Sequence, residues 1–212
     1  TDLCYENHRI WLETGGLKGK RLSLSNANLS KSNLSGLDLS GAILDEVLFY
    51  RANLTDVRFE AVEIKNCEFT CANLDRAEFE NCELIESKFD LCQINETVFS
   101  FVKFFANDFS KSKMQKVSIA NSTFIKDELF EAYLFEAKIK ATHFVECNFH
   151  SSNLTMANIS GTHFNACDFT NALCRGATIL ATNFNPPSKL PFGMKFKAED
   201  AIQELYEQDT DE

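Results

Sequence analysis

The sequence has few prolines and glycines, the residues that most often form turns, and no apolar run long enough to cross a membrane. Its 212 residues include three prolines, eight glycines and one tryptophan. The longest strongly apolar stretch, around Val98 to Ala106, contains Lys103 and is far shorter than a membrane span. The eight cysteines include no Cys-x-x-Cys pair, which is the spacing of common zinc and redox motifs. We therefore expect no membrane span and no metal site.

Positive charge is also scarce. The chain has 21 Lys and Arg against 31 Asp and Glu, a net charge of −10. This balance argues against direct nucleic-acid binding, which usually needs a basic patch, but it leaves open a protein that imitates nucleic acid. The sequence contains no glycine-rich nucleotide loop, no H-E-x-x-H and no G-x-S-x-G. We expect a protein that is not an enzyme and binds no cofactor.

What the chain does have is phenylalanine, and apolar residues recur at a fixed spacing. Twenty Phe stand against four Tyr, and from Leu24 to Phe184 every fifth residue is apolar, at 33 positions in a row without an insertion. The residue two before each of these central positions is nearly always small or β-branched. Phe has no polar atom that needs a partner, so a dry, stacked interior suits it.

A period of five fits neither the 3.6 residues of a helical turn nor the 2.0 of a strand. A chain that turns a square corner every five residues places two side chains inside and three outside, and four such sides make a coil of twenty residues. Stacked at about 4.8 Å, residues 22–186 would form about eight coils and a rod roughly 40 Å long. Gly36 and Gly41 fall at expected corners, where positive φ suits glycine. The sequence thus predicts an all-β, quadrilateral β-helix.

Several quintets match one consensus, A(D/N)Lxx. They include Ala27-Asn28-Leu29, Ala52-Asn53-Leu54, Ala72-Asn73-Leu74 and Cys167-Asp168-Phe169. Over about three quarters of its length the chain resembles the pentapeptide-repeat family. The resemblance implies a right-handed β-helix without a shared catalytic residue. It also implies a range of roles, from mimics of DNA that bind DNA gyrase to parts of secreted bacterial effectors and developmental regulators.

The N-terminal end of such a rod exposes a strand edge that needs a cover. Residues 1–21 are expected to form a helical cap, with a short helix from Glu6 to Thr14 and with Trp11 packed over the first coil. The polar start, Thr1 to Cys4, does not resemble a signal peptide. Because the chain begins with Thr rather than Met, an upstream segment with a targeting signal stays open.

The C-terminal end is expected to be covered as well. Pro186-Pro187 is predicted to end the repeat, and residues 187–212 to form a linker and a helix near Ala198 to Gln208. We expect both terminal helices to act as caps. A homodimer contact through an end cap is the alternative hypothesis.

Apolar residues also occupy outward positions in the central coils. Four successive coils of one face carry an apolar residue just after the central position, and aromatic residues stand outward on the next two faces. The four are Ile85, Phe105, Ile125 and Val145, and the aromatic residues are Phe130, Tyr133 and Phe135. Contiguous apolar patches often mark partner sites. We predict an exposed ridge and part of a belt that bind a protein, the alternative being scattered or covered side chains.

Acidic residues gather in the earlier coils. Residues 22–101 contain fourteen acidic and six basic residues, whereas residues 102–141 contain five and seven. A predicted acidic patch near one corner consists of Glu60, Glu63, Glu78, Glu80, Glu83 and Glu86. It is either an ordinary solvated surface or an electronegative docking patch.

One inward column breaks the apolar rule, because Asn107 and Asp127 occupy its small positions one coil apart. A lone buried carboxylate is costly, and burial would raise its pKa. We predict that the two side chains hydrogen-bond each other or nearby backbone, with Ser87 as a further partner. A local distortion, an ordered water and a small ligand site are the alternatives.

The favoured function is a non-enzymatic scaffold or effector module that binds an unidentified protein partner through the ridge around Phe105. The alternative is a DNA-mimicking protein of the quinolone-resistance type that binds DNA gyrase or a topoisomerase. Five cysteines fall on the small inward position, which favours reduced thiols. We therefore expect a cytoplasmic bacterial protein, with a secreted effector as the open alternative.

Overall fold

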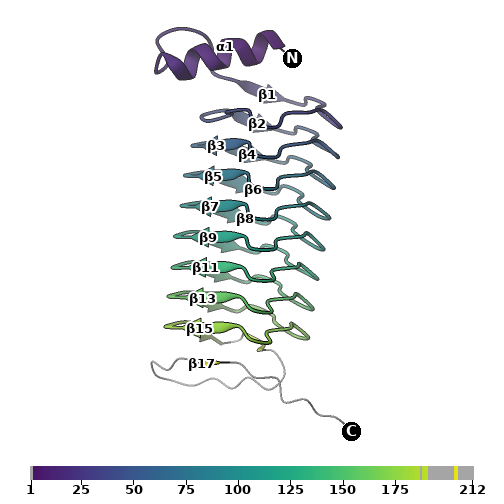
Figure 1. Cartoon of the computed structure of the whole chain (residues 1–212), viewed down its shortest axis with the longest axis vertical. Coiled ribbons are helices and arrows are strands. Elements are labelled where there is room, and N and C mark those ends of the chain that lie inside the picture. Colours follow the sequence, from purple (N-terminus) through teal and green to yellow (C-terminus); the bar gives the residue numbers. More distant parts are fainter. Residues whose placement is uncertain (1, 187, 191–202, 205–212) are drawn as a thin grey trace.

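The computed structural model describes residues 2–186, 188–190 and 203–204. It has the predicted architecture, a four-sided parallel β-helix of about eight coils with a helix across its N-terminal end (Figure 1). Among the described residues no helix is long and apolar enough to span a bilayer. The elements are α1 (Asp2–Glu13), β1 (Ser23–Ser25), β2 (Ile43–Asp45), β3 (Arg58–Glu60), β4 (Glu63–Lys65), β5 (Glu78–Glu80), β6 (Glu83–Ile85), β7 (Val98–Ser100), β8 (Lys103–Phe105), β9 (Ser118–Ala120), β10 (Thr123–Ile125), β11 (Lys138–Lys140), β12 (His143–Val145), β13 (Asn158–Ser160), β14 (His163–Asn165), β15 (Thr178–Leu180), β16 (Asn183–Asn185) and β17 (Gln203–Glu204).

Two of the four sides are regular sheets. The even-numbered strands and β1 form a nine-stranded sheet, and the odd-numbered strands from β3 to β17 form an eight-stranded sheet. Within β1 to β16 each strand pairs in parallel with the strand twenty residues away, as in Leu44↔Ile64. The other two sides pair through single bridges, such as Leu48↔Glu68. The twenty-residue coil therefore sets the position of every outward side chain.

The corners of the coil use a left-handed backbone. Positive φ was expected at glycines, and Gly36 and Gly41 have φ of 69° and 72°. Among the residues that the structure describes, the same conformation occurs at 28 non-glycine residues, with φ between 47° and 60°. This region disfavours residues with a Cβ. The corner N–H groups bond to the next coil, as Lys111 N does to the carbonyl of Phe130 at 2.8 Å, so inter-coil hydrogen bonds offset part of that cost.

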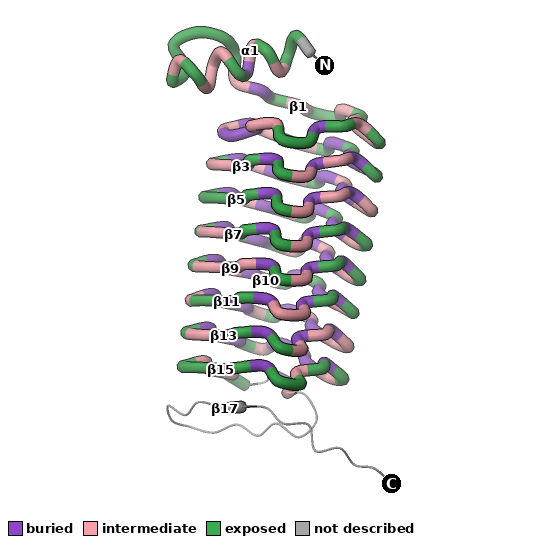
Figure 2. Tube along the Cα trace, in the orientation of Figure 1, coloured by how far each residue is buried: buried purple, intermediate pink, exposed green. Residues whose placement is uncertain are grey.

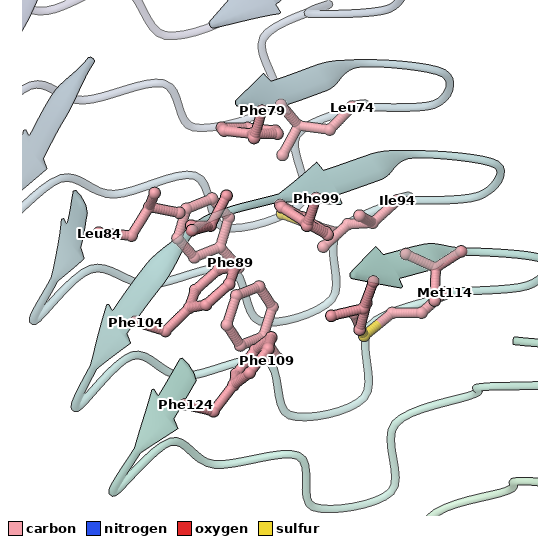
Figure 3. Packing of buried hydrophobic residues seen from close by; sticks show 14 of the residues in the cluster. Leu74, Phe79, Leu84, Phe89, Ile94, Phe99, Phe104, Phe109, Met114 and Phe124 are labelled. Atoms are coloured by element: carbon pink, nitrogen blue, oxygen red, sulfur yellow. The ribbon is translucent and has the colours of Figure 1, made fainter. Parts of the chain in front are cut away.

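Phenylalanine rings fill the interior in columns (Figure 3). The rings of Phe89 and Phe109 stack with centroids 4.8 Å apart, and those of Phe104 and Phe124 with centroids 3.9 Å apart. The column through Ile94 and Met114 contains no Phe. Figure 2 shows that buried positions recur at the same places in every central coil, with exposed residues between them. The period of five thus produces one continuous dry core.

The N-terminal cap is tied to the first coils by specific contacts. The helix begins four residues before the predicted Glu6, at Asp2. The His8 side chain is fully buried, and its Nδ1 accepts a hydrogen bond from the N–H of Leu22 at 3.1 Å. Trp11 stacks on His8 and lies against Gly41, where an added Cβ would come within 2.9 Å of the indole. The cap therefore depends on a glycine corner that leaves room for the tryptophan.

The C-terminal end agrees with the prediction in part. The register of five ends at Pro186-Pro187 as predicted, but the pairing between coils continues, because Lys189 bridges to Asp168 with a spacing one residue longer than the usual twenty. Within the predicted helix from Ala198 to Gln208, residues 203–204 form strand β17, which pairs antiparallel with β15. An open strand edge offers unpaired N–H and C=O groups, and a strand satisfies them better than a helix does. The rest of the predicted helix lies outside the described residues.

Candidate interaction surface

The predicted ridge forms one straight column on the outer face of the nine-stranded sheet. Ile85, Phe105, Ile125 and Val145 are direct register partners on β6, β8, β10 and β12. Phe105 is 40% exposed, and the other three side chains are partly buried against the column. Four coils at about 4.8 Å give a ridge roughly 14 Å long.

Polar groups frame this ridge. Beside it, Lys103 Nζ forms an ion pair with Glu83 Oε1 at 3.0 Å. At the following corner, Lys126 and Glu146 lie 3.7 Å apart. The column itself is polar outside the four coils, since Asn165 continues it on β14. An apolar centre with a charged rim is the usual anatomy of a protein–protein interface.

The predicted aromatic belt does not join the ridge. Phe130 lies on the next side, stacked on His150 with centroids 5.7 Å apart and with Lys111 over its ring. Tyr133 and Phe135 stack on each other at 6.0 Å on the following side, which is opposite the ridge. A flat partner could contact the ridge or the Tyr133 pair but not both, because the rod separates them.

The structure exposes further apolar side chains that the sequence did not predict, among them Leu91, Met156 and Leu173, and two of them lie in the coil of Phe105. Phe101, at the corner between the two sheets, is 54% exposed, and Val98 beside it on β7 is 39% exposed. Both belong to the same coil as Phe105. The signal in the sequence is a Phe at a corner where other coils have Asn, Ala or Gly. The predicted ridge uses only the outward position that directly follows the central residue, and the corner is a different position. Lys103, whose side chain is 76% exposed, lies between Phe101 and Phe105, so a charged residue separates Phe101 and Val98 from the ridge.

The predicted acidic residues are only partly brought together. Five flank the corner between the two sheets, on strands β3 to β6, whereas Glu86 lies at the far corner of the nine-stranded sheet. Three are neutralised by neighbours: Glu60 by Arg58 at 2.6 Å, Glu63 by Lys65 at 3.2 Å and Glu83 by Lys103 at 3.0 Å. The electronegative patch is consequently weaker than its composition suggests.

Asn107 and Asp127 belong to a buried hydrogen-bonded ladder. Asn107 donates its backbone N–H and its Nδ2 to Asp127 Oδ1 at 2.7 and 2.9 Å. One coil earlier, Asn107 Oδ1 accepts the N–H of Ser87, and Ser87 Oγ accepts the N–H of Cys67, both at 3.0 Å. Each side chain thus accepts the backbone N–H of the residue one coil before it. The polar column is a structural ladder in the wall of the core.

One atom of this ladder lacks a partner. Asp127 is fully buried, and its Oδ2 has no hydrogen-bond partner in the structure. Burial raises the pKa of the Asp127 carboxyl to about 7, although the hydrogen bonds from Asn107 oppose the shift. Near neutral pH the carboxyl is therefore protonated in a large fraction of molecules, which lowers the cost of burying it.

The thiols and histidines show no arrangement for metal chemistry. Burial raises the pKa of the Cys67 and Cys82 thiols to about 11, so both stay protonated at neutral pH. His143 and His163 stack outward with centroids 4.9 Å apart, and Asn183 lies beside His163. In the part of the chain that the structure describes, no three His, Cys, Asp or Glu side chains gather as metal ligands would.

Comparison with known proteins identifies relatives by fold. The family model for pentapeptide repeats matches residues 23–60 and 132–171 with eight copies. A trypsin-treated form of QnrB1, a plasmid-mediated fluoroquinolone resistance protein, has a TM-score of 0.64 at 16% identity, over 79% of this chain and 92% of that one. HetL, a pentapeptide repeat protein involved in heterocyst differentiation regulation from the cyanobacterium Nostoc sp. strain PCC 7120, has a TM-score of 0.31 at 14% identity, over 75% and 87%. A search of curated proteins gave no match.

The two matched segments are joined by coils of the same construction. Between them the register partners stay twenty residues apart, as in Phe79↔Phe99 and Phe104↔Phe124. The small inward residue, the stacked central residue and the left-handed corner recur in each coil. Residues 23–60 and 132–171 are thus pentapeptide repeats, and the coils between them have the same construction.

Proposed function

We propose that this protein is a non-enzymatic interaction module that binds a protein partner through the ridge of Ile85, Phe105, Ile125 and Val145. The observation that carries the proposal is the exact register of these four outward apolar side chains on adjacent strands. Nothing in the packing of the core requires them, since the core uses the inward residues between them. A column of this kind is expected where a partner removes it from water.

The surroundings of the ridge suggest the chemistry of the partner. The ridge is narrow and slightly convex, so it fits an apolar groove or a flat sheet better than it fits a small molecule. Lys103, Glu83 and Lys126 at its edges would meet polar or charged groups at the rim. Phe105 is the aromatic residue of these four and the most exposed of them, so we expect it to contribute most to the binding energy.

The test uses a double variant, Phe105→Ser with Ile125→Ser, and affinity capture with quantitative mass spectrometry. Both side chains point outward, so the fold should persist, as checked by circular dichroism and thermal unfolding. We expect at least a tenfold loss of a specifically captured partner, because two central apolar contacts are removed.

The matched control is Tyr133→Ser with Leu173→Ser, which removes exposed apolar side chains from the opposite side of the rod. It should retain the partner. Equal capture by wild type and by the ridge variant, or equal loss in the control, would contradict the assignment of the ridge.

A second candidate is a protein that imitates DNA and binds DNA gyrase or a topoisomerase. It is favoured by the acidic corner around Glu78 and Glu80 and by the fold shared with QnrB1. The lysines of later coils, such as Lys138 and Lys140, interrupt the negative charge along the rod and weigh against it. A gyrase supercoiling assay with and without a quinolone tests this candidate. Relief of quinolone inhibition would support it, and an unchanged assay would leave the interaction module as the proposal.

We further propose that the protein acts in the cytoplasm of a bacterium. The buried cysteines at the small inward position, including Cys67, Cys82 and Cys92, fill space as free thiols. Thiols of this kind suit a reducing compartment. Thiol counting with a maleimide probe, in freshly lysed and then denatured cells, should find all eight cysteines reduced.

A further inference from the structure

The outer face of the eight-stranded sheet carries a graded pattern of charge. Four adjacent strands of this face present two outward residues each, which are exposed or half-buried. In coil order the pairs are Glu78 and Glu80 on β5, Val98 and Ser100 on β7, Ser118 and Ala120 on β9, and Lys138 and Lys140 on β11. The face therefore reads as two acidic residues, four uncharged residues and two basic residues.

The four charged side chains are free to act between molecules. Elsewhere on the rod, charges of opposite sign pair within the chain, as in Arg58 with Glu60 on the preceding strand of the same sheet. Among the described residues, none of the charged side chains on β5 and β11 takes part in an ion pair. All four are exposed. This face therefore presents unpaired charges of both signs, separated by the two uncharged strands β7 and β9.

We propose that this face binds a second copy of the same chain, with the two rods antiparallel. A two-fold axis lying between β7 and β9 and running along the strands would place β5 of one copy over β11 of the other. Glu78 would then oppose Lys138, and Glu80 would oppose Lys140. The contacts are isologous, so each pairing occurs twice in the dimer. A two-fold axis along the rod would instead oppose like charges, which disfavours a parallel dimer.

The centre of the face suits close packing of two sheets. Between the charged strands lie only Val98 and three small residues, Ser100, Ser118 and Ala120, and these would allow the sheets to approach to about 10 Å. Val98 is 39% exposed and would oppose Ser118 of the partner copy.

The adjoining corner extends the same complementarity. In the antiparallel arrangement Glu96 would oppose Lys116, and Arg76 would oppose Glu136. Three of these residues already form ion pairs within the chain, since Lys116 and Glu136 lie 3.8 Å apart and Arg76 lies 2.8 Å from Asp56. The corner pairs would therefore adjust existing contacts rather than bury new charges. No like charges meet along either the face or this corner.

The area of the face sets the expected affinity of the dimer. Four strands of three residues cover roughly 15–20 Å by 10 Å, a few hundred Å² per copy. A stable interface usually buries about 800 Å² per partner. The dimer should consequently be weak, form at micromolar concentration or above, and weaken as salt screens its charges.

The experiment is sedimentation velocity of the whole chain over a concentration series, at low and high salt. Wild type should pass from monomer to dimer, with the dissociation constant rising at high salt. The variant Glu78→Lys with Glu80→Lys and the variant Lys138→Glu with Lys140→Glu should each be monomeric. Each reversal sets like charges against each other twice, so the dissociation constant should rise at least tenfold.

Combining the two charge reversals distinguishes this dimer from other modes of self-association, because it restores opposite charges across the proposed interface. An equal mixture of the two variants should form a heterodimer, and a single chain with all four substitutions should dimerise like wild type. The control Lys88→Glu with Lys113→Glu makes the same charge change on the other two sides and should leave dimerisation intact. Wild type that stays monomeric up to about 1 mM would overturn the proposal. Failure of both the mixture and the fourfold variant to associate would also overturn it.

The two surfaces can be tested independently. The dimer uses the eight-stranded sheet, whereas the ridge of the proposed function lies on the nine-stranded sheet. The ridge variant Phe105→Ser with Ile125→Ser should therefore still dimerise. Loss of dimerisation in that variant, with dimerisation retained in the charge variants, would transfer self-association to the ridge and overturn this inference.

Discussion

The inside and the outside of the nine-stranded sheet are made from neighbouring residues of the same strands, yet they follow different rules. On β8, Phe104 points inward, is fully buried and stacks on Phe124 with centroids 3.9 Å apart. The next residue, Phe105, points outward and is 40% exposed in a column of apolar side chains. Inside, every coil must meet the same packing requirement, because each inward side chain of a central coil lies between those of the coils before and after it.

Outside, the backbone sets only the spacing of about 4.8 Å between side chains, and their chemistry is free to vary. The two sheets illustrate this freedom. One presents an apolar ridge around Phe105, and the other presents charges of opposite sign on β5 and β11. The residues that form the core and the residues that give the surface its chemistry are therefore different residues of the same strands.

The largest effect should come from replacing Phe104 by Ala. The change removes a stacked ring and leaves a cavity in the core, so unfolding should become easier by about 3–5 kcal/mol. Phe105→Ala, one residue later, should change the free energy of unfolding by less than about 0.5 kcal/mol. Urea unfolding followed by circular dichroism measures both. Similar losses for the two variants would break the distinction between inside and outside.

A polar residue inside the core should respond to pH. The raised pKa of Asp127, about 7 in the folded protein, means that the folded state holds its proton where the unfolded state has lost it. The contribution of Asp127 to the free energy of unfolding is therefore largest below about pH 4, decreases as the pH rises toward 7, and is smallest above pH 7. Asp127→Asn keeps the acceptor for Asn107, adds a donor where Oδ2 has no partner and removes the charge.

Above pH 7 the Asn variant should be more stable than wild type by about 2–4 kcal/mol, because a pKa shift of one unit corresponds to about 1.4 kcal/mol. At pH 4 the two proteins should be nearly equal. Urea unfolding at pH 4, 6 and 8 measures the difference. A gap that does not change with pH would show that the carboxyl is not buried as described.

The N-terminal cap turns an outward corner into an inside position. Gly41 faces Trp11, and its φ is 72°. Gly41→Ala should displace the indole and destabilise the cap by about 1–2 kcal/mol. Gly161→Ala is the control, since a Cβ there meets nothing closer than 3.9 Å and Ala61 already occupies an equivalent corner. Both variants share the cost of a Cβ at positive φ, so Gly41→Ala should lose more stability than Gly161→Ala in thermal unfolding, and tryptophan fluorescence should change only in the first variant.

The smallest effect is expected for the ion pairs of the outer corners. Lys126 and Glu146 lie 3.7 Å apart, and both are more than half exposed. Lys126→Ala should lower the free energy of unfolding by less than about 1 kcal/mol, and less at high salt. Lys113→Ala removes an exposed lysine that forms no ion pair among the described residues and serves as the comparison. A decrease of more than about 2 kcal/mol in the free energy of unfolding of Lys126→Ala would show that the corner ion pairs stabilise the fold, contrary to this prediction.

The interior could be predicted because its signal repeats. Thirty-three apolar positions at a spacing of five leave one consistent arrangement, and residues such as Phe99, Phe124 and Phe149 are buried accordingly. The small inward position was equally readable, down to the proximity of Asn107 and Asp127. Both follow from a coil length that admits no insertion before Phe184.

The end of the repeat was harder to predict, because a boundary occurs once and has no period. The register of five ends at Pro186-Pro187 as predicted, but the pairing between coils continues, since Lys189 pairs with Asp168 after a single extra residue. Residues 203–204 were assigned to a helix from a short apolar stripe, but they lie beside the open edge of β15. Local pattern favoured a helix there, and the unpaired hydrogen-bonding groups of the edge favoured a strand.

The surface was predicted only where one column could be followed along the rod. The ridge appeared in the sequence as four residues at a spacing of twenty, whereas Phe101 was missed because corners were not compared with one another. The acidic cluster appears stronger in the sequence than it is in the fold, because ion pairs form between coils, as Lys103 does with Glu83, and along a strand, as Arg58 does with Glu60.

The sequence by itself determined the coil, the core and the side on which each residue lies, because a period of five states directly which side chains share the interior. The tertiary structure decided how the ends are covered, which surface charges neutralise one another and which sides bring apolar or charged columns together. Those features depend on which side chains meet along a strand and between neighbouring coils, and on edges without a repeating neighbour, and the period of five does not specify them.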